Sequence, residues 1–124
     1  MDGWKMSTII ILPFPDSKLM PNRKNGRSWA STAKEKKSSK DEGYYITLLA
    51  GLKGAKIKPG MKVMFYQPDN RKRDLDNLYA AMKHAQDGMM MAIGMDDSIL
   101  RPVVLDKTVD RNNPRVEITL EIEQ

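Results

Sequence analysis

The chain of 124 residues is long enough for one modest domain with a single hydrophobic core. It has no cysteine and one histidine, which excludes disulfides, cysteine zinc sites and two-histidine metal motifs. It also has no apolar run near the roughly 18 to 20 residues that span a bilayer. Residues 1–73 carry 16 basic and 6 acidic side chains, whereas residues 74–124 carry 5 and 10, for a net charge of +5. A basic half with a separate acidic cluster favours a polyanionic ligand together with a local cation site, although ordinary surface charge is the simpler alternative.

The first half of the chain contains three predicted elements. Residues Thr8–Leu12 form a continuous, mostly β-branched run, which predicts a strand buried on both faces. A proline-rich basic loop follows. The capping-box pair Thr32 and Glu35 then predicts a helix that begins there and ends near Ala50. A second strand is expected at Met61–Tyr66.

The second half predicts a helix at Asp74–Met91 and strands at Ile99–Lys107 and Arg115–Ile122. The last strand alternates apolar and polar residues, which is typical of an antiparallel strand with one solvated face. Pro102 places its strand near a sheet edge or a bulge. The order β-α-β-α-β-β predicts one α+β domain over residues 1–124, with a mixed four-stranded sheet and two helices.

The segment "RKRDLDN", residues 71–77, places two aspartates directly after three cations. Asp74 stands at the expected N-cap of the second helix, and Asp76 lies in its first turn. A carboxylate at either position is favoured for structural reasons, because it accepts backbone N–H bonds and complements the helix dipole. Two carboxylates preceded by Arg-Lys-Arg exceed what a helix cap requires.

The helix also carries a polar stripe beside its core face. At about 100° per residue, Asp76, Ala80, Lys83 and Asp87 share one sector. The neighbouring core stripe contains Leu75, Leu78, Tyr79, Met82 and Met89. The pair Asp96 and Asp97 follows after a loop and can return to the same end of the sheet.

Convergent carboxylates without a histidine partner suit a hard divalent cation such as Mg²⁺. In a basic protein the expected substrate of such a site is a phosphodiester. Calcium binding without catalysis is an alternative, but residues 74–77 lack the spacing of an EF-hand loop.

The same motifs, in the same order, resemble the RusA-type Holliday-junction endonucleases. The likeness rests on "RDLDNL" at residues 73–78, a helix with lysine and aspartate four residues apart, and "DDS" at residues 96–98. The segment "ILPFPDSKLMPNRKNGRSW", residues 11–29, is similar to the opening strand and basic loop of that family. The resemblance implies a cytoplasmic, bacterial or phage-encoded homodimer that nicks four-way junction DNA in recombination and repair. It implies Mg²⁺ as the cofactor, with Mn²⁺ as a possible substitute.

The resemblance also implies roles for individual carboxylates. Asp74 and Asp76 match the paired aspartates that hold the metal. Asp97 matches the third essential carboxylate, and Asp96 beside it is a further candidate ligand.

The lysine of the site departs from the family pattern. The family has an essential lysine at the position of Ala80, and here Lys83 stands three residues later. Lys83 keeps the family's spacing of four residues to an aspartate, Asp87, and shares the helix face of Ala80. We therefore expect Lys83 to be the substitute.

Basic residues of the loop, the first helix and the segment before Asp74 are expected to hold DNA phosphates. They are Arg23, Lys24, Arg27, Lys34, Lys36, Lys37, Arg71, Lys72 and Arg73. Two alternatives remain open. One is a non-catalytic junction- or DNA-binding homodimer of the same fold, and the other is a basic RNA-associated structural protein, which would leave the carboxylates unexplained.

Overall fold

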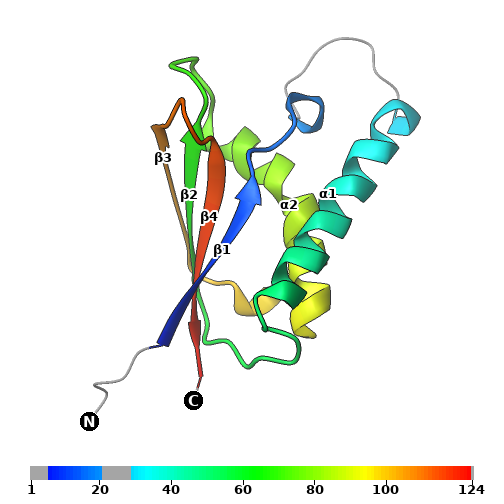
Figure 1. Ribbon diagram of the computed structural model, residues 1–124, viewed down its shortest axis with the longest axis vertical. Helices are drawn as coiled ribbons and strands as arrows, with labels where there is room; N and C mark the ends of the chain where they lie inside the picture. Colours follow the sequence, from blue (N-terminus) through cyan, green and yellow to red (C-terminus); the bar gives the residue numbers. More distant parts are fainter. Residues whose placement is uncertain (1–5, 21–28, 124) are drawn as a thin grey trace.

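A computed structural model describes residues 6–20 and 29–123 and has the predicted α+β architecture. Figure 1 shows a twisted sheet with two helices packed on one of its faces. The elements are β1 (Met6–Pro13), α1 (Trp29–Leu49), β2 (Met61–Gln67), α2 (Leu75–Ile93), β3 (Val103–Val109) and β4 (Arg115–Ile122). In these ranges neither helix combines the length and apolar character that crossing a membrane requires.

The four strands lie in the order β1-β4-β2-β3. β4 is antiparallel to both of its neighbours, and β2 and β3 are parallel, so the predicted mixed sheet is confirmed. Pro102 directly precedes β3, which is an edge strand, as expected. In β4 the residues Val116, Ile118 and Leu120 are at most 1% exposed, and the residues between them face the other side of the sheet.

The prediction that the first strand is buried on both faces is wrong. Ile10 and Leu12 are each 1% exposed beneath the helices, but Ile9 and Ile11 are each 53% exposed. β1 is an edge strand of a sheet that has helices on one face only, so its other face stays open. A short apolar run has no period that distinguishes these two situations.

Two predicted boundaries are also corrected. α1 begins at Trp29, so Thr32 lies inside the helix, and Glu35 pairs with Lys18 at 3.1 Å. β3 begins four residues later than predicted, because Ile99 belongs to a 3₁₀ turn, Asp97–Ile99, that is closed by the Leu100 amide donating to the Asp97 carbonyl at 2.9 Å.

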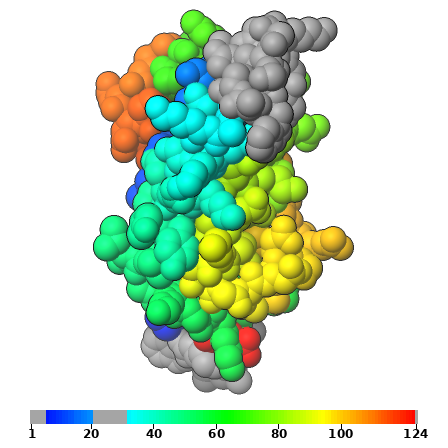
Figure 2. Space-filling model, turned by 90° about the vertical axis from the view of Figure 1, so that its right-hand side faces the viewer, coloured from blue at the N-terminus to red at the C-terminus, as the bar shows by residue number. Residues whose placement is uncertain are grey.

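Two glycines set the contact between the helices. A Cβ on Gly43 of α1 would lie 2.0 Å from the Ala85 carbonyl oxygen, and a Cβ on Gly88 of α2 would lie 1.9 Å from that of Lys40. The backbones therefore touch, and Figure 2 shows the helices side by side on the covered face. Gly88 faces α1, and Asp76 and Lys83 lie about 120° and 140° from it around the helix, so their stripe points away from α1.

Candidate metal and nucleic-acid site

Asp74 is the N-cap of α2, as predicted, but its carboxylate does not cap the helix. Its backbone is extended, with φ −76° and ψ 138°, and its side chain accepts no capping hydrogen bond. Its carbonyl oxygen accepts from the Leu78 amide at 3.1 Å. Asp76 lies in the first turn, both carboxylates are exposed, and neither forms an ion pair within the described residues. Both therefore remain available to a ligand.

The cations before Asp74 are held by a different aspartate. Arg73 donates to both carboxylate oxygens of Asp69, at 2.8 and 3.3 Å, and its side chain is 19% exposed. Its guanidinium also lies 5.4 Å from the centre of the Phe14 ring, and the Lys107 ammonium donates to its carbonyl oxygen. Arg73 thus anchors the loop that leads into α2.

Arg71 and Lys72 are placed differently from Arg73. The Arg71 side chain is 81% exposed and reaches Asp69 only at 3.8 Å, and Lys72 is exposed. Of the three cations, these two offer their charge to solvent, and their predicted phosphate contacts stay predictions. The phosphate contact predicted for Arg73 also stays a prediction, and both of its terminal guanidinium nitrogens already donate to Asp69.

A hollow of about 410 Å³ lies beside Asp74. Its apolar walls include Phe14, Pro15 and Pro68, and the polar groups around it include Asp74 and Asn77. Arg71 and Lys72 also line it. The start of α2 therefore combines two exposed carboxylates, exposed cations and a concave surface.

The two aspartates of the second acidic pair, Asp96 and Asp97, have different surroundings. The Asp96 carboxylate accepts from the Ser98 amide at 3.2 Å and caps the 3₁₀ turn, and hydrogen bonds from Ser98 lower the pKa of Asp96. The Asp97 carboxylate accepts no such bond within the described part of the chain, and its charge acts on Tyr79 of α2. Burial raises the pKa of Tyr79, the hydrogen bond to Gln86 lowers it, and the Asp97 carboxylate raises it.

Asp97 follows the C-terminal end of α2 and lines a hollow with Asp87 and Met91, whereas Asp74 and Asp76 lie at the N-terminal end of this helix. Because β2 and β3 are parallel, the two acidic pairs lie at opposite ends of the sheet, and the prediction that they share one end is wrong.

Lys83 lies on the same side of α2 as Tyr79. It is exposed, and its ammonium nitrogen is 5.5 Å from the centre of the Tyr79 ring. Asp87, four residues further on, is exposed, and a shallow surface of Asp87, Met91, Asp96 and Asp97 continues beside it. Figure 2 shows the segment after α2, in gold, beside the helix and on the side away from α1.

The donor set fits a hard cation by its chemistry. Asp74, Asp76 and Asp97 supply only carboxylate oxygens, which Mg²⁺ prefers. Within residues 6–20 and 29–123, however, no three carboxylate or imidazole groups converge closely enough to form a metal-binding cluster. The roles of these residues as ligands therefore remain predictions.

The basic residues of α1 lie in several settings. Lys34 is exposed, and Lys37 pairs with Asp41 at 2.9 Å. Burial lowers the pKa of His84 on α2, the charge of Lys36 lowers it further, and the charge of Asp87 raises it. The three predicted contacts of the basic loop, Arg23, Lys24 and Arg27, fall outside the described residues.

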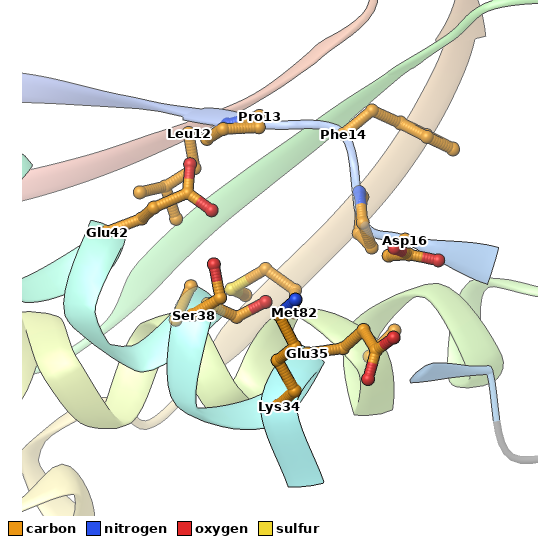
Figure 3. Close-up of a pocket in the computed structure, with 13 residues that line it drawn as sticks. Leu12, Pro13, Phe14, Asp16, Lys34, Glu35, Ser38, Glu42 and Met82 are labelled. Atoms are coloured by element: carbon orange, nitrogen blue, oxygen red, sulfur yellow. The ribbon is translucent and has the colours of Figure 1, made fainter. Parts of the chain in front are cut away.

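A second cavity, of about 390 Å³, lies between the end of β1 and the first half of α1. Figure 3 shows the carboxylates of Asp16, Glu35 and Glu42 around it, with Met82 of α2 at its base. Ala81 and Ala85 also line it, so it lies on the α1 side of α2, away from Asp76 and Lys83. It is separate from the predicted site.

Gln86, which is 2% exposed on α2, is absent from the residues predicted for the site, and Tyr79 is predicted only as a core residue. The Tyr79 hydroxyl donates to the Gln86 side-chain oxygen at 3.2 Å. One sequence feature indicates this pair: an amide residue stands within the apolar stripe of the helix, seven positions after a tyrosine on the same helix face.

Comparison with known proteins identifies the family of this chain. The family model described as "Endodeoxyribonuclease RusA" matches residues 20–121, which include α1, the loop before α2, α2 itself and the Asp96–Asp97 segment. An uncharacterized protein of Xylella fastidiosa (strain Temecula1 / ATCC 700964) is 28% identical over 126 residues, covering 97% of this chain and 80% of that protein. The matched region spans most of the chain and contains each motif of the candidate site, so the chain belongs to the RusA endodeoxyribonuclease family.

Proposed function

We propose that this chain is a magnesium-dependent endonuclease that resolves four-way DNA junctions by paired nicks. Its setting would be the cytoplasm, during DNA recombination and repair in a bacterial or phage-infected cell. The observation that carries the proposal is the start of α2 in a RusA-family chain, where Asp74 and Asp76 are exposed and form no ion pair within residues 6–20 and 29–123. Two neighbouring carboxylates that have no ion-pair partner among these residues are suited to a cation.

The residues divide the chemistry among them. Asp74 and Asp76 would hold the cation. Asp97 is proposed as a further ligand from the family resemblance, although it lies beyond the other end of α2, and Asp96 would fix the turn that presents it. Mg²⁺, when bound, supplies Lewis-acid polarisation of the scissile phosphate. Lys83 places a positive charge on the same side of α2, where it stabilises the charge that develops on the departing oxygen. Exposed cations such as Arg71 and Lys72 hold the phosphates on either side.

A homodimer fits this activity, because two symmetric cuts need two copies of the site. We propose that the copies pair through β1. Natural sheets protect their edges with charged residues or bulges, yet the eight residues of β1 include no charged side chain. Stacking through the open sheet face is less favourable, because that face carries Lys62, Asp106 and Glu117, and burying charges is costly. Antiparallel pairing of β1 with β1 of a second copy would leave those charges in solvent.

The deciding experiment is cleavage of a synthetic immobile four-way junction, beside a linear duplex made of the same arms. Each substrate is incubated without metal, with Mg²⁺ and with Mn²⁺. Metal-dependent, symmetric nicks on the junction alone are the expected result. Cleavage of both substrates at one rate, or cleavage without metal, would contradict the proposal.

A second candidate is a junction-binding homodimer without catalysis. The observation in its favour is Ala80, at the position where the family resemblance implies a lysine. It predicts salt-sensitive junction binding and no product with either metal.

A further inference from the structure

Tyr79 is fixed from the far end of its side chain. Its hydroxyl donates to the side-chain oxygen of Gln86, two turns along α2, at 3.2 Å. Gln86 is 2% exposed and lies among apolar side chains. A buried amide without a partner is costly, so this hydrogen bond holds the tyrosine hydroxyl and the amide together. The orientation of the Tyr79 ring is therefore restricted.

The Tyr79 ring in turn restrains Lys83. The ammonium nitrogen lies 5.5 Å from the ring centre, within the range of a cation–π contact. Lys83 is exposed and forms no ion pair within the described part of the chain. A lysine side chain has about 2 kcal/mol of rotamer entropy, so a lone exposed lysine would sample many positions. The ring is the feature that favours one of them.

The charge of Asp97 also acts on Tyr79. Burial is the main cause that raises the pKa of Tyr79, the hydrogen bond to Gln86 lowers it, and the Asp97 carboxylate raises it. Tyr79 thus contacts Lys83 and Gln86 directly, and the charge of Asp97 affects its pKa. These residues come from three turns of α2 and from the segment that follows it.

We propose that Tyr79 is a positioning residue of the nuclease site, which holds the Lys83 ammonium on the side of α2 where Asp97 returns, with Gln86 as its anchor. This inference rests on the proposed function, since it assigns to Tyr79 the placement of a group that acts on the scissile phosphate. Tyr79 itself is not required to touch the substrate.

The test compares Tyr79→Leu, Tyr79→Phe and Gln86→Leu with Tyr66→Leu. Tyr66 is a matched control, because its ring also contacts a cation, Arg115 at 3.8 Å, but on strand β2. Under single-turnover conditions with saturating protein and Mg²⁺, Tyr79→Leu should slow junction cleavage about tenfold, with a junction Kd within about twofold of wild type. Tyr79→Phe keeps the ring and should retain most of the rate, whereas Gln86→Leu should fall between the two. Unchanged cleavage by Tyr79→Leu would overturn the proposal.

A double-mutant cycle separates positioning from general damage to the fold. If Tyr79 acts through Lys83, Tyr79→Leu should have no further effect on cleavage in a Lys83→Ala background. The same factor of loss in both backgrounds would overturn the proposal. Gln86→Leu also serves if Tyr79→Leu does not fold, because leucine fills the space of the amide and the tyrosine hydroxyl can turn to water.

A readout independent of cleavage distinguishes failure of this inference from failure of the proposed function. In lysine-selective ¹H–¹³C NMR spectra of the metal-free protein, the ring current of Tyr79 should displace the Lys83 ε-methylene signal. Tyr79→Leu and Gln86→Leu should move this signal, whereas Tyr66→Leu should not. If the wild-type protein does not cleave junctions, the proposed function fails, and this signal alone decides whether Tyr79 positions Lys83. A signal that none of the variants moves would overturn the inference.

Discussion

Arg73 binds Asp69 through both of its terminal guanidinium nitrogens, at 2.8 and 3.3 Å, although Asp74 follows it directly in the chain. The pair closes the loop between β2 and α2. Because Asp69 takes up this charge, the carboxylates of Asp74 and Asp76 are left without an ion pair in the described structure. The local arrangement thus keeps the adjacent opposite charges from neutralising each other.

This pair predicts a pH dependence of stability. The hydrogen bond from Arg73 is the main cause that lowers the pKa of Asp69 below its usual value. The stabilisation is present above the unfolded pKa, about 3.9, and is lost as the pH falls through the lower folded pKa. Asp69→Asn should therefore have a lower Tm than wild type at pH 7 and a smaller further drop between pH 5 and pH 2, measured by circular dichroism. Asp87→Asn, an exposed site, should follow the wild-type curve, and equal curves for all three proteins would contradict the prediction.

Asp76→Asn should slow junction cleavage by about a thousandfold or more, because an amide is a poor ligand for a hard cation. Junction binding should be retained or become tighter, since one negative charge near the phosphates is removed. Cleavage and electrophoretic binding assays on the same junction measure both effects. Asp87→Asn lies on the same helix face and serves as the control. Wild-type cleavage by Asp76→Asn would refute the metal assignment.

The position of the lysine can be tested by moving it. Lys83→Ala should slow cleavage about a hundredfold, the scale of a charge or proton-transfer group in a transition state. Adding Ala80→Lys should restore part of the rate, because position 80 is one turn after Asp76 on the same face. Lys53→Ala, which removes an exposed lysine outside every predicted site, should cut at nearly the wild-type rate. If Lys83→Ala has no effect, the role of Lys83 is wrong.

Gly88→Ala should destabilise the fold by about 1–3 kcal/mol or more, because the added methyl group overpacks the helix contact. Its Cβ would lie 1.9 Å from the Lys40 carbonyl oxygen and 2.8 Å from the Tyr44 amide nitrogen. Urea unfolding monitored by circular dichroism gives the free energy of unfolding. Met91→Ala, at a position that is 62% exposed on the same helix, should change it little. Wild-type stability of Gly88→Ala would mean that the helices do not touch here.

Ile11→Lys tests the proposed pairing of β1. In an antiparallel pair centred on Ile10, Ile11 would lie beside Ile9 of the second copy, so a lysine there should weaken the dimer about tenfold or more. Sedimentation equilibrium at several protein concentrations gives the dimer Kd. Val104→Lys is the matched control, since Val104 is 52% exposed on the opposite edge strand, β3, and Ile11 is 53% exposed. Equal dimer constants for the two variants would contradict pairing through β1.

Local patterns predicted much of the architecture. The alternation of β4, the N-cap position of Asp74 and the edge location of the strand after Pro102 were all predicted correctly. Each depends on residues close in sequence: side-chain alternation, a cap followed by an amphipathic helix, or a missing N–H group. The candidate carboxylates were found in the same way, by their spacing.

The sequence by itself determined the order of the elements, the amphipathic pattern of α2 and the concentration of acidic residues after position 73. The tertiary structure decided which face of β1 is covered, that Asp69 and not Asp74 binds Arg73, and that Gln86 anchors Tyr79. These outcomes depend on which helix face meets α1, on how the loop before α2 closes and on where the chain returns after Gly94. Packing and charge pairing in three dimensions select such contacts. The spacing of residues along the chain does not identify the partner, because it leaves several candidate partners equally accessible.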